Sequence, residues 1–249
     1  MDKKRIVIIG ATSAIAEHCA RLWAQTNLID ITLVGRDTSR IERIAKDLQV
    51  RSPQSEIHIV KTGFIEPNVI QSTADNIFAS GPVDIVLIAH GTLPDQIDCQ
   101  NNLSTTHDAL EINGVSPALY AEAFARHMAV ANLGTLAIIG SVAGDRGRKS
   151  NYVYGAAKGL ITRYAQGLQH RFAGTGVKVV LIKPGPTDTP MTAHLKNQGA
   201  KLTSVESVAK NIVKAIEHGK ATAYVPCKWQ IIMLIIRHLP AFIFNKLNI

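Results

Sequence analysis

The stretch RIVIIGATSAIA, from Arg5 to Ala16, decides the fold. Its first half, Arg5–Ile9, is short, apolar and rich in β-branched residues, which indicates a strand covered on both faces. Its second half, Gly10–Ala16, is built mostly of small residues, so backbone amides at the start of a helix can approach a pyrophosphate. Gly10 is the one glycine of this stretch. Ala14 and Ala16 occupy positions where such turns usually have glycine. The turn therefore indicates either a nucleotide site or an ordinary tight turn.

The same alternation of short apolar runs and helical segments continues along the chain. Six further strands are predicted: Ile31–Val34, Ile57–Val60, Asp84–Ala89, Thr135–Gly140, Val177–Ile182 and Thr222–Val225. The pattern Thr203–Glu206 predicts a capping box at the start of a helix that runs toward His218. Strand–helix alternation predicts an α/β fold, a single doubly wound Rossmann-type domain with a parallel seven-stranded sheet. Because ligands of such sheets bind beyond the carboxyl ends of the strands, the residues that follow the strands are the candidates.

Composition limits the class of protein. The 249 residues are 46% hydrophobic and 18% charged, which suits one globular domain over residues 1–226, followed by an apolar helical tail over residues 227–249. Three separated cysteines and nine dispersed histidines predict neither disulfides nor a metal site and fit a reducing cytosol. The net charge of +8 suits an anionic membrane or a phosphorylated small molecule, and no motif indicates nucleic acid. The apolar run Ile6–Ile9 is too short for a signal peptide.

Residues after the second predicted strand bear on the choice of cofactor. A carboxylate at this place would bind the ribose diol of NAD, whereas an arginine can pair with the 2′-phosphate of NADP. The order Gly35, Arg36, Asp37 therefore favours NADP(H) over NAD(H). Alternatively, Arg36 covers the adenine or is solvated, and Asp37 caps the next helix.

Two tyrosines and a lysine in SNYVYGAAKG, residues Ser150 to Gly159, suggest acid–base chemistry. If this stretch opens a helix, Tyr154 shares a face with Lys158 at i+4, whereas Tyr152 shares its face with Ala156. A nearby ammonium favours the phenolate, so Lys158 is expected to lower the pKa of Tyr154 toward the working range. Tyr152 is then a pocket wall or a packing residue.

Further motifs follow the other strands in order. Ser141 ends the fifth strand in IIGSVAG, 13 residues before Tyr154, and Asn113 lies in EINGVSPAL. Ala89–His90–Gly91 follows the fourth strand, and KPGPTDTP, Lys183 to Pro190, follows the sixth. Together with Gly10 and Tyr154-x-x-x-Lys158, these motifs resemble the short-chain dehydrogenase/reductase family over nearly the full length of the chain.

The resemblance implies an NAD(P)-dependent oxidoreductase that interconverts a carbonyl and an alcohol. It implies four catalytic residues: Asn113, Ser141, Tyr154 and Lys158. Tyr154 would donate a proton, Lys158 would also hold the nicotinamide ribose, and Ser141 would bind the reacting oxygen. Asn113 would position a water, and Thr187 and Thr189 would anchor the carboxamide. The implied cofactor site contains Gly10, Thr12, Ser13, Ala14, Ile15, Arg36, Ala89, His90, Gly91, Tyr154, Lys158, Pro184, Gly185, Thr187 and Thr189.

The sequence departs from the family pattern at the cofactor end. Besides Ala14 and Ala16 in the turn, Gly63 stands where the family usually has an aspartate near the adenine. These departures concern the affinity for the cofactor or the choice of it rather than catalysis.

Basic residues between Ser141 and Tyr154 bear on the substrate. Arg146, Arg148 and Lys149 in GDRGRKSN lie on a loop that should border the active site, where they suit a phosphate or carboxylate. The alternative is a solvated loop. Residues Asp188 to Leu202 are expected to form a substrate lid. Its candidate contacts are Met191, His194 and Leu195, and Tyr152 is a further candidate.

The tail CKWQIIMLIIRHLPAFIFNKLNI, Cys227 to Ile249, is apolar but interrupted by Arg237, His238 and Pro240. A spanning helix needs about 20 mostly apolar residues, so the tail is not expected to cross a membrane. It fits two short helices at the membrane interface, with Trp229 and cations at the headgroups. The alternative is a contact in a homo-oligomer.

The basic loop, YVP and the apolar tail together resemble the subgroup of decaprenylphosphoryl-ketoribose reductases. That resemblance implies a polyprenyl-phosphate-linked keto sugar as substrate, a cytoplasmic location at the inner membrane face, and a partner oxidase that makes the ketone. Two alternatives remain. One is a reductase of a soluble or acyl-linked keto compound whose tail serves oligomerisation, and the other is a non-catalytic, cofactor-binding regulator.

Overall fold

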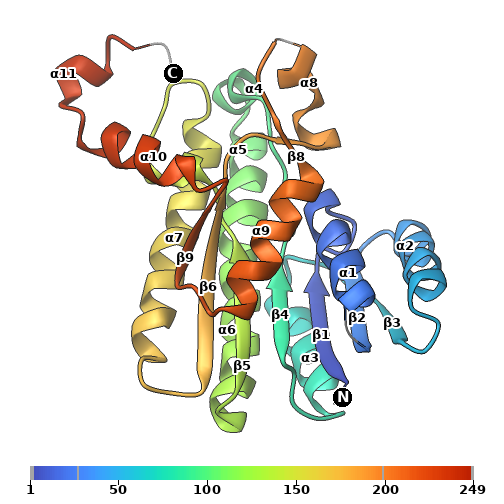
Figure 1. Cartoon of the computed structure of the whole chain (residues 1–249). Helices are drawn as coiled ribbons and strands as arrows, with labels where there is room; N and C mark the ends of the chain where they lie inside the picture. Colours follow the sequence, from blue (N-terminus) through green and yellow to red (C-terminus); the bar gives the residue numbers. More distant parts are fainter. Residues whose placement is uncertain (1–2, 27, 198, 248–249) are drawn as a thin grey trace.

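Seven parallel strands form the centre of the computed structural model, which describes residues 3–26, 28–197 and 199–247 (Figure 1). The order in the sheet is β3-β2-β1-β4-β5-β6-β9. The strands are β1 (Lys4–Ile9), β2 (Ile29–Gly35), β3 (Glu56–Lys61), β4 (Ile85–Ile88), β5 (Gly134–Ile139), β6 (Val177–Pro184) and β9 (Thr222–Val225). Each predicted strand is present. From β1 the chain continues outward through β2 to β3 and then returns to β4, on the other side of β1. The predicted doubly wound Rossmann-type sheet is confirmed.

Helices cover both faces of this sheet (Figure 1). They are α1 (Ala14–Thr26), α2 (Thr38–Arg51), α3 (Pro67–Phe78), α4 (Gln96–Asn101), α5 (Leu103–Leu110), α6 (Ser116–Ala131), α7 (Tyr152–Arg171), α8 (Ala193–Asn197), α9 (Val205–Glu217), α10 (Lys228–His238) and α11 (Ala241–Phe244). Along β1, Ile6 and Ile8 join a core with α1, α2 and α9. Val7 and Ile9 point the other way, into a core with α3, α6 and α7. Successive side chains of a strand alternate between faces, so a strand must be apolar throughout to serve two cores.

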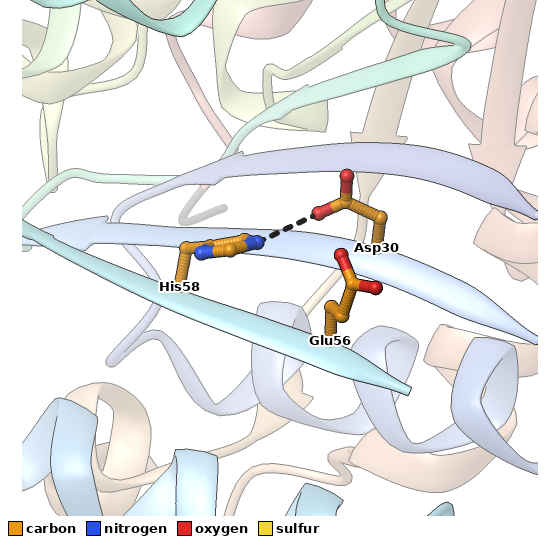
Figure 2. A group of neighbouring side chains, drawn as sticks. All are labelled: Asp30, Glu56 and His58. Atoms are coloured by element: carbon orange, nitrogen blue, oxygen red, sulfur yellow. Dashed lines mark ion pairs between the residues drawn. The ribbon is translucent and has the colours of Figure 1, made fainter. Parts of the chain in front are cut away.

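The strand β3 is the exception to the expectation that every strand is covered on both faces. It is the edge of the sheet, and Glu56 and His58 are exposed. Figure 2 shows these two side chains beside Asp30 of β2, which is the register partner of Glu56. His58 Nε2 lies 3.2 Å from Asp30 Oδ1, and Lys3 pairs with Glu56. An edge strand has a neighbour on one side only, and its charged side chains discourage pairing with another chain.

Two helix starts test the predicted caps. Asp37 caps α2, because its side chain accepts a hydrogen bond from the amide of Arg40 at 3.1 Å. At α9 the predicted capping box is wrong, because the N-cap is Ser204 rather than Thr203 and its side chain accepts from the amide of Ser207. Glu206 therefore stands at the second helical position and not at the third, where a capping box needs it. Thr203 and Ser204 also form the two-residue strand β8 (Thr203–Ser204).

The last part of the chain lies at the end of the sheet opposite to the N-terminus (Figure 1). The strand β8 pairs with β7 (Thr187–Asp188) and closes the segment that carries α8. In the described residues, no helix combines the length and the apolar character that crossing a membrane requires. Residues 1–2 of the predicted domain, 198 of the predicted lid and 248–249 of the predicted tail lie outside the described residues.

Candidate active site

A cavity of about 170 Å³ opens at the carboxyl ends of the strands. The residues that line it come from the segments after β1, β4, β5 and β6 and from α7, as expected for a sheet of this topology. They include the whole predicted catalytic set and many of the predicted cofactor residues: Ser13, Ile15, Ala89, His90, Gly91, Asn113, Ser141, Tyr154, Lys158, Pro184, Gly185, Thr187 and Thr189. Gly10, Thr12, Ala14 and Arg36 do not line this cavity.

Gly10 is required by the turn between β1 and α1. Its φ is +84°, and a Cβ there would lie 2.6 Å from the backbone nitrogen of His90. Only glycine accepts this conformation without strain and allows the two segments after β1 and β4 to touch. The chain then enters α1 at Ala14, so the free amides of the first helical turn face the strand ends. This turn is a cradle that fits the pyrophosphate of a dinucleotide.

Asn113 lies in a π-helical turn, Glu111–Val115, between α5 and α6. Such turns insert one residue into a helix and often mark functional sites. Asn113 is fully buried, its Oδ1 accepts from the amide of Thr92 at 2.9 Å, and its Nδ2 donates to the carbonyl of Ala109 at 2.9 Å. Gly91 leaves the space for it, because a Cβ on Gly91 would lie 2.7 Å from Asn113 Oδ1.

Lys158 and Tyr154 lie one turn apart on α7, as the sequence predicts. The Lys158 side chain is buried and donates to the carbonyl of Ile139 at 3.1 Å, and burial lowers its pKa to about 8. Burial raises the pKa of Tyr154, and a hydrogen bond with Ser141 partly opposes this rise. The expected lowering of the Tyr154 pKa by Lys158 is therefore wrong for this structure, in which the ammonium lies 5.8 Å from the ring centroid. At neutral pH Tyr154 is a protonated phenol held beside a hydroxyl.

His90 is buried against the nucleotide turn. Its Nε2 lies 2.8 Å from Ser116 Oγ, its ring stacks on Phe64 at 4.6 Å, and its Nδ1 has no partner among the described residues. Burial, together with the charges of Lys158 and Arg36, lowers the pKa of His90 to about 3. His90 is therefore neutral at pH 7, and the charge near it comes from the two cations.

The end of β2 presents arginines and a carboxylate. Arg36 is exposed, with its guanidinium 5.4 Å from the Phe64 ring centroid. Asp37 is engaged with α2, since it accepts from Ser39 Oγ at 2.7 Å as well as from the Arg40 amide. Arg40, which the sequence reasoning did not select, donates to the carbonyl of Thr12 at 3.3 Å and so lies beside the turn. Two guanidiniums thus flank this end of the site.

The segment after β6 forms the opposite wall. The amide of Gly185 donates to the carbonyl of Val225, and Thr187 Oγ1 donates to the carbonyl of Gly185, both at 2.9 Å. Thr189 caps the short helical turn Pro190–Thr192 through a reciprocal bond with Thr192. Of the predicted lid contacts, Met191 and Leu195 line the cavity, whereas His194 is exposed and does not.

The predicted basic loop separates into three environments. Arg148 lines the cavity and is half-buried, and its Nε has no hydrogen-bond partner in the part of the chain that the structure describes. Arg146 lies outside the lining, with its guanidinium bound to the carbonyls of Ile236 and Leu239. Lys149 is exposed and also lies outside it, as does Tyr152. Of these four predicted substrate contacts, only Arg148 faces the cavity.

Several lining residues were not predicted. They are Thr92, Leu93, Ile139, Gly140, Val142, Ala143, Asn151, Pro186 and Thr192. Asn151 precedes α7, and its buried Oδ1 has no hydrogen-bond partner within residues 3–26, 28–197 and 199–247. Its position directly before the Tyr154 helix was the available signal, because a residue that opens a helix at a strand end is brought to the same edge of the sheet.

Comparisons with known proteins agree with this geometry. The short chain dehydrogenase family model matches residues 4–200. An uncharacterized oxidoreductase of Streptomyces coelicolor is 29% identical over 251 residues, covering 98% of this chain and 96% of its own. An uncharacterized oxidoreductase of Mycobacterium tuberculosis is 29% identical over 167 residues, 67% of each chain.

Solved structures share the fold at lower identity. An actinorhodin polyketide ketoreductase with NADPH superposes with a TM-score of 0.80 at 18% identity, over 90% of this chain and 96% of its own. A short-chain type dehydrogenase/reductase from Mycobacterium marinum gives 0.81 at 16% identity, over 91% and 95%. With the family match over residues 4–200, the chain belongs to the short-chain dehydrogenase family and is an NAD(P)-dependent oxidoreductase.

Proposed function

We propose that this chain uses NADPH to reduce a keto group on a phosphate- or polyprenyl-phosphate-linked keto sugar at a membrane surface. The observation that carries the proposal is Arg148. Its guanidinium lines the cavity with Tyr154, and no carboxylate among the described residues forms an ion pair with it. Asp145, the nearest acid on the same loop, is paired with Lys183 and accepts from Tyr224 Oη at 2.6 Å. A partly buried cation that forms no ion pair, and that feels only the electrostatic attraction of Asp145, favours an anionic ligand.

The residues around the cavity account for carbonyl reduction. When bound, a reduced nicotinamide supplies the hydride, with the turn at Gly10, Lys158 and Thr187 as its holders. The carbonyl oxygen gains negative charge as its carbon is reduced. The Ser141 hydroxyl binds that oxygen, and the raised pKa of Tyr154 keeps the phenol protonated so that it can deliver the proton from Oη. The products are an alcohol and a tyrosinate, which regains its proton from solvent.

Charge at the end of β2 supports NADPH over NADH. The Asp37 carboxylate is engaged with the amide of Arg40 and with Ser39, at the start of α2. Arg36 and Arg40 are both exposed at this end, and guanidiniums bind phosphate in a bidentate manner.

The outer face of the tail supports the membrane surface. Exposed apolar side chains recur at Ile231, Leu234 and Ile235 on α10 and at Phe242 on α11. From Cys227 to Ile249 the sequence contains lysine and arginine but no aspartate or glutamate. An apolar face with a cationic rim suits an anionic lipid surface. We place the protein at the cytoplasmic face, where an oxidase would supply the lipid-linked ketone, as the resemblance to decaprenylphosphoryl-ketoribose reductases implies.

The substrate proposal is tested with matched substrates and variants. Full-length protein and NADPH are given a ketose phosphate or the same ketose without phosphate. Arg148→Met is expected to lower kcat/KM for the phosphate ester by about 10-fold or more, because a hydrogen bond to a charged group contributes roughly 1.5–3 kcal/mol. Arg163→Met is the control, since Arg163 is exposed on α7 and bonds only Gln166 among the described residues. Equal turnover of both ketoses, unaffected by Arg148→Met, would instead favour the alternative of a soluble or acyl-linked keto compound that carries no phosphate.

Vesicles test the location. The protein should sediment with phosphatidylglycerol vesicles and much less with phosphatidylcholine vesicles, and Leu234→Asp should abolish the difference. A change in oligomeric state on Leu234→Asp, without any vesicle binding by the wild type, would move the tail into a subunit contact.

A further inference from the structure

The inner face of the tail packs against the active site. Met233 of α10 is fully buried, whereas its neighbours Leu234 and Ile235 are more than half exposed. The indole of Trp229 lies directly on Gly185, since a Cβ on Gly185 would overlap it. Gly185 also lines the cavity, so the first turn of α10 forms the outer layer of that wall.

Arg146 fastens the far end of the same helix. Its Nη1 donates to the carbonyl of Ile236 at 2.5 Å and to the carbonyl of Leu239 at 2.6 Å. The last carbonyls of a helix lack intrahelical partners and carry partial negative charge, so a guanidinium there is a favourable cap. The guanidinium also lies 3.8 Å from the ring centroid of Phe244, which brings α11 into the same contact.

The loop that carries Arg146 is itself part of the active site. It starts at Ser141, which caps the turn Val142–Asp145, and it ends at Arg148. Arg148 Nη2 lies 3.3 Å from the sulfur of Met233, so the cavity cation touches the buried residue of α10. Asp145 ties the middle of the loop to β6 and β9 through Lys183 and Tyr224.

We propose that α10 is a working part of the active site and that Trp229 and Arg146 are positioning residues. Trp229 fixes the Pro184–Gly185 turn, against which the nicotinamide would lie. Arg146 fixes the Ser141–Arg148 loop by holding it to the end of α10. Neither residue touches the reacting atoms, and both act through the residues that line the cavity.

The inference rests on the proposed placement of the cofactor in this cavity, and the test uses NADPH binding so that the two can be separated. Trp229 and the fully buried Trp23 are the two tryptophans of the chain. Excitation of tryptophan should give energy transfer to bound NADPH, and Trp229→Phe should remove most of that signal when both proteins are saturated with NADPH. Trp229→Ala should raise the Kd of NADPH by about 10-fold, because a small misplacement of a binding group has large effects.

Arg146 is tested by comparing the change in KM for the substrate with the change in the Kd of NADPH. Arg146→Met should raise KM for the phosphorylated ketose several-fold more than it changes the Kd of NADPH, and Arg146→Lys should restore part of the loss. The matched control is Arg171→Met. Arg171, like Arg146, lies over an aromatic ring, that of Phe172, but it pairs with the carboxylate of Glu122 and lies at the far end of α7.

Each outcome has one meaning. If the wild type does not bind NADPH, the proposed function fails, and with it the placement of the cofactor on which the role of Trp229 rests. If the wild type binds NADPH but folded Trp229→Ala binds it equally well, Trp229 is not a positioning residue. If Trp229→Ala does not fold, the energy transfer decides, and equal transfer from wild type and Trp229→Phe would overturn the placement. Equal losses in Arg146→Met and Arg171→Met would reduce Arg146 to a general stabilising residue.

Discussion

The two walls of the cavity differ in how they are held. The wall built from the segments after β4 and β5, the turn Glu111–Val115 and α7 carries three buried polar side chains that have hydrogen-bond partners: Asn113, Ser141 and Lys158 are all less than a tenth exposed. The wall behind Gly185 is backed by α10, where Met233 is the buried residue and Ile231, Leu234 and Ile235 face outward. The first wall cannot move without leaving buried polar groups unpaired, whereas the second is held by a few side chains.

The comparison indicates a division of labour. Chemistry needs groups fixed to a fraction of an ångström, and these lie on the wall that the whole sheet supports. Under our proposal, selection of the substrate depends on the wall that α10 backs, and α10 belongs to a short helical tail with few buried side chains. Variants on the two walls should therefore fail in different ways.

The largest effect is expected from Tyr154→Phe. The change removes the phenolic proton while keeping the ring that packs above Lys158. Loss of a general acid should lower kcat by about 1000-fold with NADPH affinity retained. The measurement is single-turnover NADPH oxidation together with a binding titration. An unchanged rate, or unchanged function in cells, would show that the chain is the non-catalytic regulator.

Gly91→Ala should have the next largest effect, on the same wall. The added methyl would lie 2.7 Å from Asn113 Oδ1, inside the π-helical turn. Displacing a buried, fully bonded amide should cost about 1–3 kcal/mol of unfolding free energy and lower kcat in parallel. Gly63→Ala is the control, since a Cβ at Gly63 would meet nothing within 4 Å. Urea unfolding of both variants decides, and equal stability would mean that Asn113 moves freely.

His90→Gln tests the wall that follows β4 through the pH dependence of the protein's stability. The folded-state pKa of His90 is about 3 and that of the unfolded chain is about 6.5, so below pH 6.5 the unfolded state binds a proton that the folded state excludes. Wild-type stability should therefore fall by about 1.4 kcal/mol for each pH unit between 6 and 4 through this residue, and His90→Gln should lack that contribution. Parallel denaturation curves of the two proteins from pH 7 to 5 would contradict the assignment.

The sheet was predictable from short-range patterns, and so was the meeting of the candidate catalytic residues at one edge of it. Apolar β-branched runs fix the strands, and parallel strands bring Ser141, Tyr154 and Asn113 to one edge whatever the details of packing. The pKa of Tyr154 was not predictable in this way. The i+4 spacing gives the approach of Lys158 but not the burial, and burial dominates.

The basic loop and the tail show where a linear pattern fails. Arg146, Arg148 and Lys149 are nearly consecutive, yet one binds the end of α10, one faces the cavity and one is solvated. The contacts depend on where α10 lies, more than 80 residues later in the chain. The roles assigned to these residues, the tail's partner and the division at residue 226 stay predictions.

The smallest effect is expected from Ile235→Ser, which compares the outer face of α10 with its inner face. Ile235 is 58% exposed, so serine there should change the unfolding free energy by no more than about 0.5 kcal/mol. Met233, two residues earlier and fully buried, is the matched inward position, where serine removes the core contact and the sulfur that Arg148 touches. Because the tail can detach before the sheet unfolds, Met233→Ser should speed proteolysis at α10 more than it lowers the global transition. Limited proteolysis and thermal unfolding measure the two separately. Equal sensitivity at Met233 and Ile235 would mean that α10 has no inner face in solution, and the wall behind Gly185 would then be open.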